Sequence, residues 1–267
     1  ILLISWMAAK MIVGSTMTTG QLMSMIVYAT QILSSLMMLS MVFVMIIISR
    51  ASAERIVEIL DEKSDLTNGE SPVTEVKDGS VVFDHVSFSY TGKKDKICLS
   101  DINLNIRSGE TVGIIGGTGS GKSSVVNLIP RFYDVTSGFI KVDGKDVKDY
   151  PLEELRGKIG TVLQKAVLFH GTIRENLKWG NPDATEEDLN RAITVAQAKE
   201  FVDNKEGRLD FEIEQGGKNL SGGQRQRLTI ARAVVKKPEI LILDDSASAL
   251  DFATDAALRK AIREMEG

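Results

Sequence analysis

The pattern of hydrophobic and polar positions divides the chain into an apolar first part and a mixed second part. No charged residue lies between Lys10 and Arg50, and Leu22 to Ile48 form an almost unbroken apolar run. At about 1.5 Å per residue, a helix over this run measures about 40 Å, enough to cross a bilayer core of about 30 Å. We therefore expect a membrane-spanning helix here. A buried helix of a soluble protein is the alternative for such a run.

The residues around this run indicate how it lies in a membrane. Residues 1–13 are apolar but too few to span a bilayer, so we interpret them as the tail of a span that begins upstream. A signal peptide would need a basic leader and a small-residue cleavage site, and neither is seen. Arg50 and Arg55 follow the long run and place its end in the cytoplasm. Polar side chains along the run either line a substrate path or pack against other helices: Tyr28, Thr30, Gln31, Ser34, Ser35 and Ser40.

Beyond Arg50 the chain is charged and mixed, as in a soluble globular domain. Helical spacing of apolar residues continues to Lys63, and the polar stretch 64–72 is typical of a linker. These changes predict three parts: the end of a transmembrane domain over residues 1–49, a cytoplasmic helix and linker over 50–78, and a globular domain over 79–267.

Strand and helix patterns are mixed along this globular part. Alternation of apolar and polar residues predicts half-buried strands over 81–90 and 99–106. Short apolar runs predict further strands over 111–115, 139–142, 159–163 and 240–243. Helical spacing predicts helices over 124–128, 185–202 and 223–237, the second with Thr185 as its N-cap.

Charge and cysteine content restrict the class of partner and compartment. The 267-residue chain has a formal net charge of −4, and Lys10 is the one charge before Arg50, so the globular part is more acidic still. An acidic balance argues against nucleic acid as the main partner. The single cysteine, Cys98, cannot form an internal disulfide, which fits a reducing cytosol, and we expect it to be a small core residue.

One stretch carries a recognisable binding chemistry. Gly116 to Ser123 reads Gly-Gly-Thr-Gly-Ser-Gly-Lys-Ser, the G-x-x-x-x-G-K-[ST] pattern of a phosphate-binding loop, between a predicted strand and a predicted helix. Glycines let backbone N–H groups approach phosphate oxygens, Lys122 reaches the outer phosphates, and the Ser123 hydroxyl ligates Mg²⁺. ATP and Mg²⁺ are therefore the expected cofactors. The predicted nucleotide contacts are Gly116, Gly117, Thr118, Gly119, Ser120, Gly121, Lys122, Ser123 and Ser124.

A second motif makes the resemblance to one family specific. Leu220-Ser-Gly-Gly-Gln224 resembles the signature of ATP-binding cassette (ABC) ATPases. Gln164 at a strand end is similar to that family's Q-loop glutamine, Asp244 to its Walker B aspartate, and Ser248 to Asp251 to its D-loop. Arg131 to Asp134 and Phe169 to Asn176 resemble the exporter branch, as does the membrane helix ahead of the ATPase.

The resemblance implies an architecture. It is an all-α transmembrane segment followed by an α/β P-loop NTPase domain with an antiparallel β subdomain and a helical signature subdomain, so that 79–267 is the ATP-binding cassette domain of an exporter-type half-transporter. The resemblance implies that the protein is integral to the cell membrane, with its ATPase domain in the cytoplasm. The implied partners are a second half-transporter, the lipid bilayer and an exported substrate. The resemblance also implies a switch histidine, on a strand past Gly267, and His85 and His170 are interpreted as structural.

The resemblance also implies residue roles. Tyr90 stacks on adenine, Gln164 contacts the nucleotide, the metal and the attacking water, and Asp244 holds Mg²⁺ through water. Taken alone, Tyr90 also fits an ordinary strand aromatic, and Gln164 a solvated loop amide. The signature residues face the γ-phosphate held by the partner's loop, so that two ATP molecules lie between two domains. These are Ser221, Gly222, Gly223 and Gln224.

One position departs from the family pattern. The family has Glu after the Walker B aspartate as the base for the attacking water, and this chain has Asp245. Asp reaches about 1.5 Å less far than Glu, and a general base must lie within about 3 Å of its water. We therefore expect a slow or inactive site of the kind found in heterodimeric exporters. A homodimer with Asp245 as a weak catalytic base is the alternative, and a soluble cassette protein acting on DNA or ribosomes is more distant.

Overall fold

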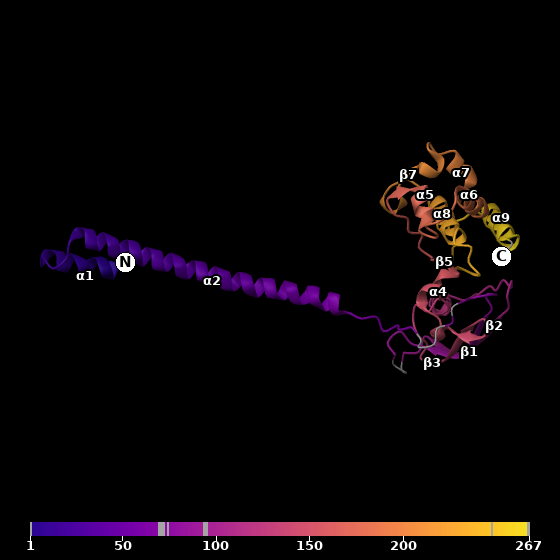
Figure 1. Cartoon of the computed structure of the whole chain (residues 1–267), viewed down its shortest axis with the longest axis horizontal. Helices are drawn as coiled ribbons and strands as arrows, with labels where there is room; N and C mark the ends of the chain where they lie inside the picture. Colours follow the sequence, from indigo (N-terminus) through magenta and orange to yellow (C-terminus); the bar gives the residue numbers. More distant parts are fainter. Residues whose placement is uncertain (1, 69–72, 74, 93–95, 247, 266–267) are drawn as a thin grey trace. The chain divides into compact units, whose positions relative to one another are not determined.

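The computed structural model describes residues 2–68, 73, 75–92, 96–246 and 248–265 (Figure 1). The chain forms two compact units, 1–65 and 66–267. The first contains α1 (Leu2–Val13) and α2 (Thr19–Asp61), which contact each other. Of the described helices, α2 is the one long and apolar enough to cross a membrane, with a mean hydropathy of 2.5 over its most apolar 18 residues.

Local hydrogen bonds explain how α2 begins and how it tolerates polar residues. Thr18 caps the helix, its hydroxyl accepting from the Gln21 N–H while the Gln21 side chain accepts from the Thr18 N–H. Within the helix, the hydroxyls of Ser24, Thr30 and Ser35 donate to the carbonyl four residues earlier, at 2.9–3.1 Å. These side chains are thus satisfied by their own helix, as a low-dielectric membrane requires. The predicted helix to Lys63 ends at Asp61.

The second unit begins with an antiparallel sheet, as the alternating pattern predicts. Its strands are β1 (Val81–Phe88), β2 (Leu99–Ile106), β3 (Ser137–Val142) and β4 (Lys145–Asp146), in the order β2-β1-β3-β4. A bulge interrupts β1 at His85, where φ is 48°, and Gly138 lies opposite it. A Cβ on Gly138 would lie 2.3 Å from the His85 carbonyl oxygen, so the close approach of β1 and β3 requires glycine.

Short helices cover this sheet and complete its core. They are α3 (Lys122–Leu128), the 3₁₀ turn η1 (Val147–Asp149) and α4 (Leu152–Gly157). Phe83 and Phe88 of β1 pack with Leu128 of α3 and Tyr150 in one buried cluster. The Tyr150 hydroxyl donates to the Val142 carbonyl at 3.0 Å, and burial raises the pKa of this phenol.

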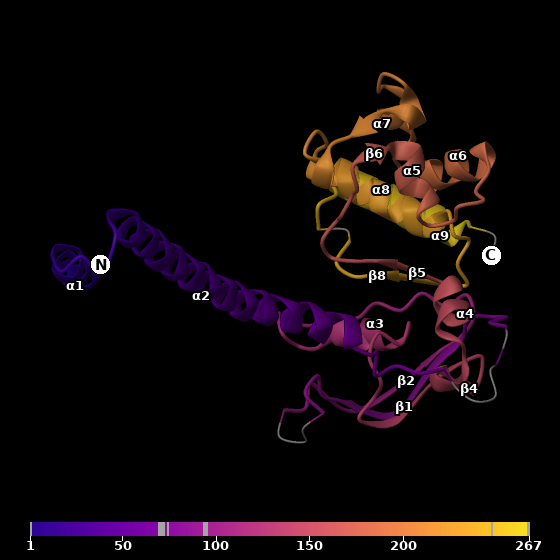
Figure 2. The same ribbon diagram turned by 60° about the vertical axis from the view of Figure 1, so that its left-hand side comes forward.

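A parallel pair, β5 (Ile159–Val162) and β8 (Ile240–Leu243), lies next to this sheet and confirms both apolar runs as strands (Figure 2). The prediction of a buried strand over 111–115 is wrong. The run has no strand, and the side chain of Ile115 is 98% exposed. A strand is defined by hydrogen bonds to a neighbouring strand and not by apolar composition alone. Within the described residues, β5 and β8 pair only with each other, and 111–115 does not join them.

The remaining elements gather around the long helix α8 (Figure 2). Their bounds are β6 (Gly171–Thr172), α5 (Ile173–Lys178), α6 (Glu186–Val195), α7 (Lys199–Asp203), η2 (Arg208–Asp210), β7 (Glu212–Ile213), η3 (Gln215–Gly217), α8 (Gly222–Val234) and α9 (Phe252–Arg263). The single helix predicted over 185–202 is wrong, because the chain breaks between α6 and α7 at Gln197, where φ is 56°. Thr185 is confirmed as the N-cap of α6.

Candidate functional site

The phosphate-binding loop has the backbone that its glycines predict. Gly121, with a φ of 90°, is the N-cap of α3, and a Cβ there would lie 2.7 Å from Leu99 Cδ2. A Cβ on Gly116 would lie 2.6 Å from Ser120 Oγ. At Gly117 and Gly119, in contrast, a Cβ would meet no heavy atom within 4 Å. Gly116 and Gly121 therefore leave no room for a side chain, whereas the space beside Gly117 and Gly119 is free, as a bound phosphate would need.

Lys122 spans this loop. Its Nζ donates to the carbonyls of Gly116 at 2.7 Å and Gly117 at 2.8 Å. An ammonium group has three donors, so one donor remains for a phosphate oxygen. Ser123 follows in the first turn of α3 with an exposed side chain. The two residues that the sequence assigns to phosphate and metal thus lie at the start of the same helix, where its dipole is positive.

Tyr90 lies in the turn after β1 and meets the same helix. Tyr90 Oη and Ser124 Oγ share a hydrogen bond of 2.9 Å, and Cys98 Sγ lies 3.2 Å from Ser124 Oγ. The Tyr90 ring packs edge-on against Phe88 and Tyr133, with centroids 4.7 and 5.0 Å away. The expectation that Cys98 belongs to the core is wrong, because it precedes β2 on the surface and is exposed.

Polar residues follow the two parallel strands at their carboxyl ends. Gln164 comes after β5, and Asp244 and Asp245 come directly after β8, where the Asp244 N–H donates to the Val162 carbonyl at 2.9 Å. The Gln164 side-chain amide donates to Asp245 Oδ2 at 3.3 Å. Asp245 has a φ of 49°, a left-handed conformation that Asp and Asn adopt more readily than other non-glycine residues. The structure thus brings Gln164 and Asp245 together.

The signature motif forms the start of α8. Ser221 is its N-cap, with its hydroxyl accepting from the Gln224 N–H and its own N–H donating to Gln224 Oε1. A Cβ on Gly222 would meet no heavy atom within 4 Å, whereas a Cβ on Gly223 would lie 3.1 Å from the Ala249 carbonyl oxygen. The signature therefore has one open glycine and one that touches the segment similar to a D-loop.

These residues form three local groups: the phosphate loop with Tyr90, Gln164 with Asp245, and the signature with Ala249. Sequence reasoning missed Tyr133 as a neighbour of Tyr90, although the resemblance of 131–134 to exporters pointed to that segment. The two histidines are exposed, and each lies beside a carboxylate, His85 at 2.7 Å from Asp101 and His170 at 3.5 Å from Glu212.

The loop fits a nucleotide with its metal. Among the described residues no three acidic, His or Cys side chains cluster in a way that could hold a metal ion. Mg²⁺ bound with phosphates needs no such cage, because it keeps waters and takes one or two protein oxygens. The Ser123 hydroxyl and the Asp244 carboxylate are the donors of that kind that the sequence predicts.

Comparisons with known proteins identify the family. A family model described as ABC transporter matches residues 99–248. An uncharacterized ABC transporter ATP-binding protein of Bacillus subtilis is 41% identical over 98% of this chain and 45% of the relative. A putative multidrug export ATP-binding/permease protein of Staphylococcus aureus is 45% identical over 77% of this chain and 36% of the relative. The structure of a bacterial Atm1-family ABC exporter with ATP bound matches with a TM-score of 0.76 and 33% identity, over 93% of this chain and 44% of that chain. The chain thus spans less than half the length of these relatives.

Proposed function

The chain belongs to the ABC transporter family, and we propose that it is part of an ATP-driven membrane exporter subunit that binds Mg·ATP and couples pairing of two ATPase domains to export. The observation that carries this proposal is the phosphate loop. Two of its glycines are tightly packed, two face free space, and Lys122 donates a hydrogen bond across it. The signature at the start of α8, in the same domain, supports it, because the two motifs belong to opposite faces of an ATP sandwich.

We propose a division of labour within the nucleotide site. The backbone of 116–121 and Lys122 hold the phosphates, Tyr90 stacks on the adenine, and Ser123, Gln164 and Asp244 hold the metal, Asp244 through water. Base stacking on an aromatic ring contributes about 1–3 kcal/mol in comparable contacts. Ser221 to Gln224 complete the partner's site, with the open face of Gly222 turned to its γ-phosphate.

The hydrolytic step depends on Asp245 and Gln164. Bound Mg·ATP supplies the γ-phosphoryl group and the metal charge that offsets developing negative charge. Asp245 accepts the proton of the attacking water, and Gln164 orients that water. The 3.3 Å contact between the two side chains supports their joint role, and the side chain of Asp is one methylene shorter than that of the Glu expected here. We propose that turnover at this site is slow.

Two assemblies follow from that slow site. In a heterodimer, the intact signature of this chain completes a competent site on the partner, which turns over for the pair. In a homodimer, both sites rely on Asp245 as a weak base. The combination of a complete signature with a shortened base favours the heterodimer.

The first unit supports a place in the membrane. The apolar length of α2 and its locally satisfied hydroxyls suit a bilayer-spanning helix, with Arg50 at the cytoplasmic end. We propose that the ATPase domain lies in the cytoplasm and that the exported substrates are drug compounds. The multidrug export in the name of the Staphylococcus aureus relative supports that class.

Lys122→Ala tests nucleotide binding directly. The variant loses a charge-assisted contact worth about 1.5–3 kcal/mol, so the dissociation constant of Mg·ATP should rise by about 10- to 100-fold. Calorimetric titration of the full-length protein in lipid measures it. Lys199→Ala is the matched control, because Lys199 forms a surface ion pair with Asp203 within α7, and the affinity of this variant should equal wild type. Unchanged affinity in Lys122→Ala would refute the proposal.

A further inference from the structure

Lys10 is the one charged residue in the first 49 positions, and it lies near the end of α1. Its ammonium lies 3.8 Å from the centroid of the Trp6 ring, one turn earlier on the same helix. Side chains of a helix point toward its N-terminus, which brings a residue over the one four positions before it. The two side chains therefore form one unit, a cation on the face of an indole ring.

This unit faces away from α2. Helix α1 contacts α2, and Ala8 is its buried residue, at 3% exposed. Trp6 and Lys10 each lie two residues from Ala8, which at about 100° per residue places both on the opposite side of the helix. The Trp6 side chain is 62% exposed, and Lys10 is exposed as well. A molecule that binds this pair therefore lies outside the contact between α1 and α2.

The first unit supplies no countercharge near Lys10. Residues 1–53 contain no Asp or Glu, and Glu54 lies 35 residues beyond Thr19, about 50 Å along α2. Arg50, in contrast, has an acid on its own helix, because its Nε donates to Glu54 Oε1 at 2.8 Å. A cation at a bilayer costs free energy unless an anion pairs with it. The anion that balances Lys10 is therefore not supplied by residues 1–53.

The depth of the pair in the proposed membrane fits a lipid headgroup. With Arg50 at the cytoplasmic end of α2, the turn over residues 14–18 lies at the extracytoplasmic surface. Lys10 is three residues before Val13, the last residue of α1, so its backbone lies about 4.5 Å from the start of that turn. This distance is within a headgroup layer of about 5–8 Å. Trp is enriched at the same level, because its ring has an apolar body and a polar N–H.

We propose that Lys10 and Trp6 form a binding site for the phosphate of an anionic phospholipid in the extracytoplasmic leaflet. Lys10 donates to the phosphate as a point charge, and the Trp6 ring holds the ammonium at this depth. The inference rests on the proposed placement of α2 in a membrane and does not depend on the nucleotide site.

Native mass spectrometry of the full-length protein tests the site by titration with phosphatidylglycerol and with phosphatidylcholine of the same acyl chains. Lys10→Gln should weaken phosphatidylglycerol binding about fivefold, the effect of one basic residue at a membrane surface, and leave phosphatidylcholine binding unchanged. Lys10→Arg should bind both lipids like wild type. Lys63→Gln is the matched control, because it removes the same charge from an exposed lysine beyond the end of α2, and its lipid affinities should equal wild type.

Trp6→Leu tests the role of the ring. The variant should weaken phosphatidylglycerol binding about two- to fivefold, the effect of an exposed cation–π contact. Because Trp6 acts through the Lys10 ammonium, the double variant should bind no more weakly than Lys10→Gln. Additive losses would refute the pair as one site. Both side chains are exposed, so the variants should keep the Tm of wild type.

The outcomes separate the inference from the proposed function. If Lys10→Gln binds phosphatidylglycerol like wild type, another part of the protein or an exported compound balances the lysine, and the inference is refuted. An equal loss for both lipids refutes it too, because the site then does not respond to the charge of the headgroup. Absence of lipid binding by wild type refutes the membrane placement and the inference together. Absence of Mg·ATP binding by wild type refutes the proposed nucleotide function and leaves the lipid result as it is.

Discussion

At the scale of single residues, Arg131 is a buried charged side chain near the predicted nucleotide site. Its side chain is 4% exposed, and its backbone is left-handed with a φ of 51°. Nε donates to Asp134 Oδ1 at 2.7 Å and Nη2 to Oδ2 at 3.2 Å, while Nη1 is buried without a hydrogen-bond partner among the described residues. A guanidinium cannot lose its proton in a protein, so its burial depends on Asp134. Tyr133, whose ring contacts that of Tyr90, lies between Arg131 and Asp134 in the sequence.

Asp134→Asn should therefore destabilise the domain. Removing one partner of a buried pair costs about 3–5 kcal/mol, and since Asp134 is 34% exposed we expect about 2–3 kcal/mol, or about 4–12 °C in Tm. Thermal unfolding of the detergent-solubilised protein measures it. Asp255→Asn is the control, because its partner Arg259 is 61% exposed.

The stability that the Arg131–Asp134 pair contributes should decrease as the pH falls. The Arg131 hydrogen bond holds the pKa of Asp134 below its usual range. The stabilisation is then fully present above the unfolded pKa of about 4 and is lost as the pH falls through the lowered folded pKa. The Tm difference between wild type and variant should be full at pH 6 and shrink below pH 4. A difference that is constant with pH would contradict the ion pair as its cause.

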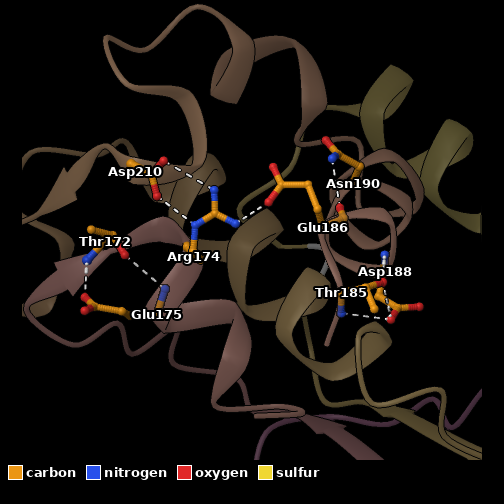
Figure 3. Close-up of polar contacts among 8 residues, drawn as sticks. All are labelled: Thr172, Arg174, Glu175, Thr185, Glu186, Asp188, Asn190 and Asp210. Atoms are coloured by element: carbon orange, nitrogen blue, oxygen red, sulfur yellow. Dashed lines mark hydrogen bonds and ion pairs between the residues drawn. The ribbon is translucent and has the colours of Figure 1, made fainter. Parts of the chain in front are cut away.

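At the scale of elements, one arginine joins three segments of the helical part (Figure 3). Arg174 of α5 donates to Asp210 of η2 at 2.7 and 3.3 Å and also to Glu186 at the start of α6. Both carboxylates raise the pKa of the guanidinium, and the arginine lowers that of Asp210. The fork geometry needs Arg, because Lys offers a single point charge.

Arg174→Met should lower Tm by about 2–4 °C, since it removes the contacts that join α5 to both neighbours. Arg174→Lys should recover part of the loss, because it retains charge but not the fork. Lys199→Met is the control, as it removes one surface pair within α7. Thermal unfolding in low and high salt checks the charge contribution, and an effect no larger than that of Lys199→Met would contradict the joining role.

Elements with local signals could be predicted from the sequence, and those without could not. The bounds of 99–106 and 240–243 are confirmed as predicted, and Thr185 caps its helix through a local bond with Asp188. The run 111–115 has the composition of a strand, but pairing depends on distant segments. The helix break at Gln197 could not be predicted, because no glycine or proline lies there. In the site, the loop backbone followed from its glycines, whereas the contact between Tyr90 and Ser124 spans 34 positions and has no sequence signal.

At the scale of the whole molecule, the proposed function divides the chain between two ATP sites. In that proposal, the phosphate loop and Asp245 belong to the site that this chain builds, and Ser221 to Gln224 belong to the site that it lends to a partner. If Asp245 slows the first site and the intact signature completes the second, a heterodimer should respond unequally to substitutions at the two.

The asymmetry is testable with two variants in the assembled pair. Ser221→Arg places a bulky cation against the partner's γ-phosphate and should abolish most ATPase activity. Asp245→Asn disables a site that is already slow and should leave most turnover intact. Because Ser221 also caps α8, Thr185→Arg is the matched control: it removes the equivalent capping box of α6, far from the signature in sequence, and should retain turnover. Steady-state hydrolysis by full-length chains in lipid, with the partner present, measures all three. If Asp245→Asn removes turnover as completely as Ser221→Arg, Asp245 is a working catalytic base and the homodimer replaces the heterodimer.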